Sequence, residues 1–257
     1  MCGTNDRKLI LITNDDGVSA QGIAVLTELM QELGDVIVVA PDGPRSGASC
    51  GITPTRPVGL REVERTAGKV VYACSGTPVD CVKLASEQCV PRVPDLVVSG
   101  INHGDNASVS IHYSGTMGAV IEGCAKGVPS IGFSLRTFSH HCDFTPYREV
   151  IVKVARHVLE NGLPEQVCLN VNFPEVERLE GIRVCRMGRG LWTGEWVDAH
   201  NPHGQRQFWL AGRFVNLDPD DDDVDYNALD QGYATIVPVR LDMTDYDSMA
   251  ALRGALE

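Results

Sequence analysis

The alternation of short apolar runs with helix-like segments most constrains the fold of this 257-residue chain. The run Lys8–Thr13 is mostly aliphatic and is followed by Asn14-Asp15-Asp16-Gly17. Such a strand is typical of a sheet covered on both faces. Strands that alternate with helices predict βαβ units and a mostly parallel sheet. The expected strands are 8–13, 35–40, 70–74, 95–99 and 129–133, with helices at 21–33, 79–89 and about 116–126.

The second half of the chain departs from this alternation. Residues 147–161 have helical periodicity and 167–173 read as a strand, but the segments after residue 180 are short and β-like. They indicate an extension or hairpin arm and not a second α/β unit. We expect one domain, with its core at about 8–180 and a C-terminal arm at about 181–257. The β-like pieces of the arm are 182–187, 206–216 and 233–241.

The charge balance limits the partners of this protein. Its formal net charge is −12, so no basic face is available to neutralise the phosphates of a nucleic-acid polymer. The acidic run Asp218–Asp223 is expected to be a solvated loop. A calcium site is the less favoured interpretation, because the run lacks the spaced Gly and terminal Glu of an EF-hand loop.

The cysteines and the apolar runs bear on location. The nine cysteines are odd in number and include no Cys-x-x-Cys pair, which favours a reducing compartment over a disulfide framework. Residues 1–6 lack the apolar stretch of a signal peptide, and no apolar run approaches membrane-spanning length. We therefore expect a cytoplasmic protein with no membrane partner.

The adjacent carboxylates Asp15 and Asp16 follow the first strand, where ligands bind in open α/β sheets. Two neighbouring negative charges repel unless a cation or protons neutralise them, and a hard metal ion does so most simply. In a regular strand their side chains would point to opposite faces. Gly17 permits the turn that would bring both to one ion.

The ends of the next strands carry the same kinds of residue. Carboxylate, amide and hydroxyl oxygens suit Mg²⁺, Mn²⁺ or Ca²⁺ better than zinc. Each segment alone is an ordinary turn or helix cap, but their shared position at one edge of the sheet indicates a site. These segments are 45–47 (Arg-Ser-Gly), 75–80 (Ser-Gly-Thr-Pro-Val-Asp), 99–106 (Ser-Gly-Ile-Asn-His-Gly-Asp-Asn) and 112–116 (His-Tyr-Ser-Gly-Thr).

The segment Ser114-Gly115-Thr116 precedes a helix, so its free backbone N–H groups, its hydroxyls and the helix dipole favour an anion. A dication beside it would polarise a phosphoryl group and lower the pKa of a bound water, which is the chemistry of phosphoester hydrolysis. His103 and His112 are close enough in sequence to act as acid or base, although a loop histidine is more often structural.

A thiol phosphatase is a weaker alternative, based on His141-Cys142 and Arg148. This spacing matches the Cys-(any five)-Arg signature. The intervening residues 143–147 contain no Gly to wrap the backbone around a phosphate, and Pro146 lacks an N–H.

These motifs, in this order, resemble those of the SurE family of survival-protein-type 5′(3′)-nucleotidases. The segment Tyr226–Val239 also resembles the ending of that family. The resemblance implies a Rossmann-like α/β fold with helices on both faces and a C-terminal β-rich arm exchanged between the subunits of a homodimer or homotetramer.

The resemblance also implies roles for individual residues. It assigns one divalent metal per subunit, Mg²⁺ or Mn²⁺ with Ca²⁺ possible, to Asp15, Asp16, Ser46 and Asn102. It makes Asp15, Asp16 and Asn102 the catalytic residues. It assigns the phosphate to Asn106, Ser114, Gly115 and Thr116.

The implied activity is that of a hydrolase that converts nucleoside 5′- and 3′-monophosphates to nucleoside and phosphate. We expect attack by a metal-activated water, because the site offers oxygen ligands and no obvious nucleophile–base pair. Two alternatives stay open. One is a broader phosphatase or exopolyphosphatase, and the other is a non-catalytic nucleotide or metal sensor on the same fold.

Overall fold

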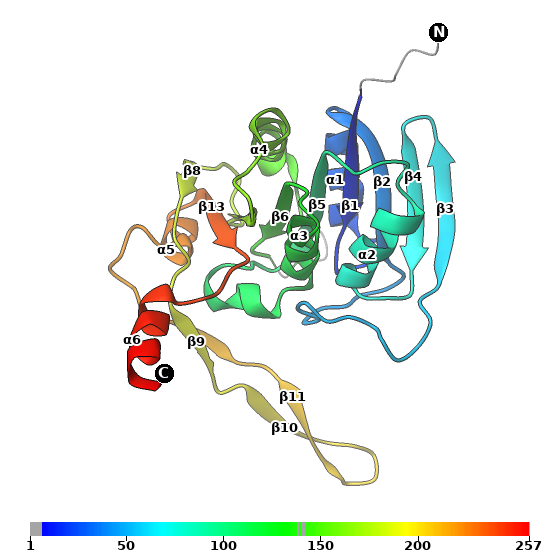
Figure 1. Ribbon diagram of the computed structural model, residues 1–257. Helices are drawn as coiled ribbons and strands as arrows, with labels where there is room; N and C mark the ends of the chain where they lie inside the picture. Colours follow the sequence, from blue (N-terminus) through cyan, green and yellow to red (C-terminus); the bar gives the residue numbers. More distant parts are fainter. Residues whose placement is uncertain (1–6, 138, 140–141, 257) are drawn as a thin grey trace.

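A nine-stranded sheet forms the centre of this protein in a computed structural model that describes residues 7–137, 139 and 142–256. The strands lie in the order β3-β4-β2-β1-β5-β6-β7-β13-β8 (Figure 1). Neighbours from β4 to β7 pair in parallel, as the sequence predicts. The strands are β1 (Lys8–Thr13), β2 (Gly34–Pro41), β3 (Leu60–Thr66), β4 (Lys69–Cys74), β5 (Leu96–His103), β6 (Ser130–Leu135), β7 (Val167–Phe173), β8 (Gly181–Val184) and β13 (Tyr233–Arg240).

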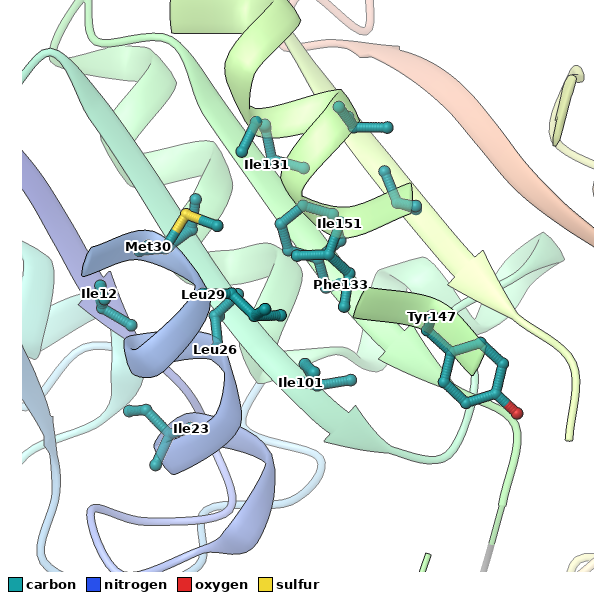
Figure 2. Packing of buried hydrophobic residues seen from close by; sticks show 14 of the residues in the cluster. Ile12, Ile23, Leu26, Leu29, Met30, Ile101, Ile131, Phe133, Tyr147 and Ile151 are labelled. Atoms are coloured by element: carbon teal, nitrogen blue, oxygen red, sulfur yellow. The ribbon is translucent and has the colours of Figure 1, made fainter. Parts of the chain in front are cut away.

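Helices cover both faces of the sheet. Side chains alternate along β1, so that Ile10 and Ile12 belong to the core cluster that includes residues of α1 (Gln21–Gln31) and α4 (Arg148–Asn161), and Figure 2 shows Ile12 beside α1. Leu9 and Leu11 pack on the opposite face, in a cluster with residues of α2 (Pro78–Gln88) and α3 (Gly115–Ala125). The central strands are thus packed between two cores, one on each face of the sheet.

The C-terminal segment contributes to the main sheet and also leaves it. Strand β13 inserts between β7 and β8, antiparallel to β7 and parallel to β8. The expected extension over 181–257 therefore divides: β8 and β13 complete the sheet, and the four strands between them form a hairpin arm that projects from it (Figure 1). The arm strands are β9 (Gly190–Thr193), β10 (Trp196–His200), β11 (Arg206–Leu210) and β12 (Arg213–Asn216), with β10 paired to β11 and β9 to β12.

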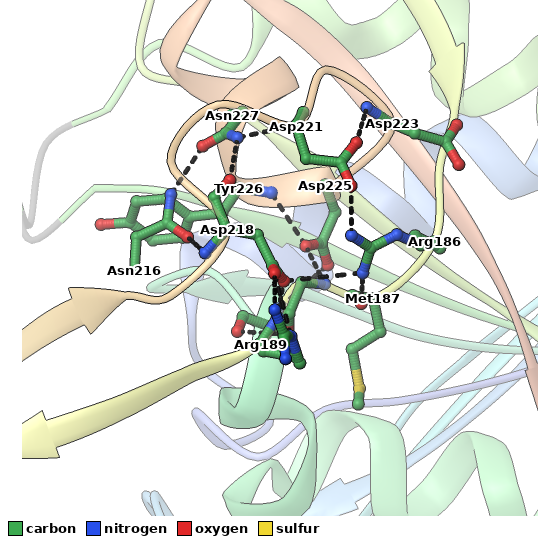
Figure 3. Close-up of polar contacts among 12 residues, drawn as sticks. Arg186, Met187, Arg189, Asn216, Asp218, Asp221, Asp223, Asp225, Tyr226 and Asn227 are labelled. Atoms are coloured by element: carbon green, nitrogen blue, oxygen red, sulfur yellow. Dashed lines mark hydrogen bonds and ion pairs between the residues drawn. The ribbon is translucent and has the colours of Figure 1, made fainter.

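A polar cluster holds the base of the arm (Figure 3). Asp218 is only 7% exposed and accepts hydrogen bonds from the backbone N–H and the guanidinium of Arg189, at 2.6–2.9 Å. Arg186 pairs with Asp221 and Asp218. The expectation of a solvated loop is therefore wrong for Asp218, because two arginines that lie far away in sequence neutralise this part of the run.

Several elements of the structure lack a clear sequence signal. Strand β3 is exposed along its whole length, so its side chains show no apolar alternation, and its pairing with β4 holds it at the edge of the sheet. Two short helices, α5 (Asp225–Asp230) and α6 (Tyr246–Leu256), follow the arm. Two 3-10 turns, η1 (Ser108–Tyr113) and η2 (Thr145–Tyr147), precede α3 and α4.

No helix within the described part of the chain is long and apolar enough to cross a membrane. The described cysteines are all free thiols.

Candidate functional site

The carboxyl ends of β1 and β5 and the start of α3 meet at a cavity of about 610 Å³. Five of the residues that the sequence singles out line it together: Asp15, Ser46, Asn102, Asn106 and Ser114. The expected convergence of polar side chains at this edge therefore occurs in the folded protein. The segment 75–80 does not line the cavity, because its Asp80 caps α2 with Thr77 and binds the backbone of Thr53.

A tight turn places the two adjacent carboxylates. The Asn14 side chain closes the turn, donating to Gly17 O at 2.9 Å and accepting from Gly17 N at 3.2 Å. Gly17 has φ +100°, a conformation that glycine adopts without strain. Arg45 N donates to Asp15 O at 2.7 Å, which fixes the loop that carries Ser46 beside the end of β1.

The Asp15 side chain is 4% exposed and accepts a hydrogen bond of 2.6 Å from the Thr116 hydroxyl. Burial raises the pKa of Asp15 to about 6; the bond from Thr116 opposes this rise, and the charge of Asp16 adds to it. An ionised Asp15 is therefore unfavourable unless a positive charge joins it.

Asp16 is half-buried beside β5. Its Oδ2 accepts from His103 N at 3.2 Å and lies 3.4 Å from His103 Nδ1. The other ring nitrogen, Nε2, lies 3.4 Å from the Cys142 Sγ. His103 is thus the histidine at this site, since it lines the cavity whereas His112 is exposed and outside it.

An irregularity in β5 presents Asn102 to the cavity. The register between β5 and β6 shifts between Ser99 and Asn102, as in a β-bulge that re-aims a side chain. Gly100 is required there, because it has φ +130° and a Cβ would lie 2.2 Å from Phe133 O. The Asn102 amide nitrogen donates to Gly104 O at 2.8 Å, which leaves its carbonyl oxygen free for a ligand.

A buried asparagine network supports Asn106. Its backbone N–H donates to Asn172 Oδ1 at 2.7 Å, its carbonyl accepts from Asn170 at 2.8 Å, and its side chain donates to the Ser134 hydroxyl at 2.7 Å. Asn172 in turn donates to Asn170. Because these buried groups satisfy one another, the backbone of Asn106 has one fixed position at the cavity wall.

The start of α3 lies against Asp15. Ser114 is the N-cap, and its hydroxyl accepts from Met117 N at 3.0 Å. A Cβ on Gly115 would lie 2.9 Å from the Asp15 Cβ, so only glycine fits there comfortably. Gly115 and Thr116 lie behind the cavity wall and contact Asp15 rather than line the cavity.

The wall of the cavity also includes residues that sequence reasoning missed. Trp192, Glu195, Leu210 and Ala211 come from the arm, and Ser110 comes from the loop before α3. Asp105 and Tyr113, which belong to the segments found at the strand ends, also line the cavity. The arm is about eighty residues away from that loop in sequence. Nothing in the local sequence pattern of the arm predicts that it reaches the cavity wall.

The donor set fits a hard divalent cation. Asp15 supplies a carboxylate to the cavity wall, and Ser46 and Asn102 add a hydroxyl and an amide oxygen. Asp16 is the next residue along the chain and does not itself line the cavity. No three His, Cys, Asp or Glu side chains in the described part of the chain are grouped to hold a metal. A cation would therefore depend on two carboxylates and neutral oxygens. The buried Asp15 carboxylate is the ligand that a bound cation would stabilise most, because burial disfavours its ionised form.

The residues of the thiol-phosphatase alternative do not assemble. Cys142 is buried, its pKa is raised by that burial, and it does not line the cavity. Arg148 pairs with Glu28 on the surface at 2.6 Å. His141 lies outside the described residues.

The fold and the site define a Rossmann-like α/β protein with an oxygen-rich pocket at the carboxyl edge of its sheet. Its sequence matches the family described as "Survival protein SurE" over residues 10–194, and the chain belongs to that family.

Proteins of known name and structure agree with this assignment. The chain is 49% identical to the 5′-nucleotidase SurE of Phocaeicola vulgatus, over 96% of each chain. It is 47% identical to the protein of the same name from Bacteroides fragilis, over 97% of this chain and 98% of that one. The SurE crystal structure from Aquifex aeolicus superposes with a TM-score of 0.82 and 34% identity, and the match covers 97% of this chain and all of the other.

Proposed function

We propose that this protein is a divalent-metal-dependent phosphatase that hydrolyses nucleoside 5′- and 3′-monophosphates. The observation that carries the proposal is the buried Asp15 carboxylate, which sits in one pocket with hydroxyl and amide oxygens at the N-terminus of α3. The names of its relatives, which are 5′-nucleotidases, support the same activity.

The proposed metal ligands are Asp15, Asp16, Ser46 and Asn102. Mg²⁺ or Mn²⁺ suits these oxygens, and Ca²⁺ is the third candidate. When bound, such a cation polarises the phosphoryl group and lowers the pKa of a water molecule. His103 fixes Asp16 through its backbone N–H.

The phosphate is proposed to lie against Asn106 and the start of α3, at Ser114, Gly115 and Thr116. The helix N-terminus favours its negative charge, and Asn106 orients it from a backbone held by the asparagine network. In the reaction a water oxygen bonds to phosphorus and the bond to the ester oxygen breaks. The departing nucleoside oxygen takes up a proton, which gives nucleoside and inorganic phosphate.

Phosphate release from nucleoside monophosphates tests the proposal. We expect turnover that EDTA abolishes, that Mn²⁺ or Mg²⁺ restores and that thiol alkylation leaves unchanged. Asp16→Asn should lose nearly all turnover with the fold intact. Activity that survives EDTA and is lost on alkylation would contradict the metal site. A phosphorylated enzyme trapped by rapid quench would contradict direct attack by water. Saturable nucleotide binding without release would indicate a sensor.

We also propose that the arm is exchanged between the subunits of a homodimer or homotetramer. Large apolar side chains on the arm are exposed, among them Trp196, Phe208 and Trp209, and such a surface favours contact with another chain. Light scattering of the full chain tests this, since a monomeric mass would contradict it.

The free thiols of the described cysteines are consistent with a cytoplasmic location, which fractionation of the source cells would test.

A further inference from the structure

The cavity has two chemically different ends. One end carries the oxygen donors at the carboxyl edge of the sheet. The other is formed by the arm, where Trp192 and Glu195 line the cavity with Leu210 and Ala211. At about 610 Å³ the cavity has room for more than a phosphate group and is in the size range of sites for whole small molecules.

Trp192 and Glu195 lie next to each other over Gly212. A Cβ at Gly212 would lie 3.4 Å from both the Trp192 Cε3 and the Glu195 Cγ, and the φ of +125° at this position suits glycine. Ala211 N donates to Glu195 O at 2.8 Å, and this hydrogen bond joins the two sides of the arm beside Gly212. A flat group that stacks on the indole would therefore present its edge near the carboxylate.

A series of ring contacts joins Trp192 to the rest of the site. Its ring meets Phe214 edge-on at 5.7 Å, and Phe214 lies 4.5 Å from the ring of Tyr226. Arg136 stacks 4.2 Å above Tyr226 and pairs at 2.8 Å with Asp105, which lines the same cavity. The indole is therefore held in a defined place relative to the loop that carries Asn106.

The charge of the cavity limits what it accepts. The described residues that line it include no Lys or Arg, whereas Asp105 and Glu195 add carboxylates to its wall. Arg136 neutralises Asp105, but no Lys or Arg among the described lining residues faces Glu195, so a chain of further phosphates would be repelled there. A neutral group with N–H donors would be accepted.

We propose that Trp192 and Glu195 form the base-binding end of this site and that they favour a guanine base. The inference rests on the proposed nucleotidase function. Trp192 stacks on the base, as aromatic side chains do with nucleobases in general. Glu195 accepts hydrogen bonds from the base edge. Guanine offers an N1–H and an N2 amino group side by side, which matches the two oxygens of a carboxylate, whereas adenine offers one amino group.

The test compares kcat/KM for GMP, AMP and the base-free ester ribose 5-phosphate, each with Mn²⁺. Trp192→Leu should lower kcat/KM for both nucleotides by about tenfold and leave ribose 5-phosphate unchanged, because a stacked base contributes a factor of this order. Trp192→Phe should retain most of the activity on nucleotides. Glu195→Gln should lower kcat/KM for GMP by about tenfold and that for AMP much less, because only guanine offers the two adjacent N–H donors that the carboxylate accepts.

Tyr246→Leu is the control for loss of an aromatic ring, since Tyr246 lies on α6, is 57% exposed and does not line the cavity. Light scattering on each variant separates a change of assembly from a change of specificity. Equal losses on ribose 5-phosphate in Trp192→Leu would make Trp192 merely structural and overturn its role. Equal effects of Glu195→Gln on GMP and AMP would overturn the guanine assignment. If the wild-type protein released no phosphate from any substrate, the proposed function would fail and this inference with it.

Discussion

The Thr116 hydroxyl donates a hydrogen bond of 2.6 Å to the Asp15 carboxylate, and both side chains are buried. This bond joins the first turn of α3 to the end of β1, two elements a hundred residues apart in sequence. The proposed phosphate end and the proposed metal end of the pocket therefore share one rigid junction. A change on either side of it is expected to affect both functions.

We expect Asp15→Asn to stabilise the metal-free protein at pH 7.5. Burial raises the pKa of Asp15 from its ordinary value of 3.8 to about 6, so the folded protein binds this proton more tightly than the unfolded chain does. The resulting stabilisation is fully present below about pH 4 and is lost as the pH rises through 6. At pH 7.5 the variant should gain roughly 2–3 kcal/mol in free energy of unfolding.

Urea denaturation in EDTA at several pH values measures this gain, which should shrink towards zero as the pH falls to 4. The same variant should lose nearly all phosphate release. A gain of equal size at every pH would mean that the ionisation of Asp15 is not its cause.

Gly115→Ala should displace Asp15, because the added Cβ would lie 2.9 Å from the Asp15 Cβ and 3.0 Å from its Oδ2. Phosphate release should fall by about tenfold to a hundredfold, since small displacements at a reacting centre have effects of this order. Gly254→Ala is the matched control, as a helical glycine with open space around its Cβ position. Steady-state kinetics at saturating Mn²⁺ compares the two, and equal activities would place Gly115 outside the site.

Asn172→Ala should weaken the support of Asn106, because it leaves the Asn106 N–H buried without its 2.7 Å acceptor. An unsatisfied buried donor costs about 1–3 kcal/mol of stability. We expect KM for the nucleotide to rise more than kcat falls, if Asn106 holds the phosphate. Asn161→Ala, at the exposed end of α4, is the control. Thermal unfolding and steady-state kinetics measure the two effects, and an unchanged KM would argue against a phosphate contact at Asn106.

Asp218→Ala should loosen the base of the arm, because Asp218 accepts three hydrogen bonds from Arg189. Amide hydrogen exchange should become faster in β9 and β12, while that in β1 and β5 stays unchanged. Asp220→Ala is the control, since Asp220 is an exposed residue of the same acidic run. Unchanged exchange in β9 would show that the ring contacts of Trp192 hold the arm without Asp218.

Local pattern was sufficient for the elements that surround the site. The aliphatic run before Asn14 predicts β1 because a strand buried on both faces needs continuous apolar side chains. The turn at Gly17 and the helix that begins after Ser114 follow from residues within four positions of each. Strand β3 was not predicted, because an exposed edge strand is held by backbone pairing and its side chains show no apolar pattern.

Distant contacts decided the rest. The sequence alone determined the α/β core and the grouping of Asp15, Asn102 and Ser114 at one edge, because strand direction and turn chemistry are encoded locally. Only the tertiary structure placed β13 between β7 and β8, paired Arg189 with Asp218 and brought Trp192 to the cavity wall. These pairings depend on which remote surfaces bury the most area and satisfy the most buried polar groups, and no short window of sequence contains that comparison.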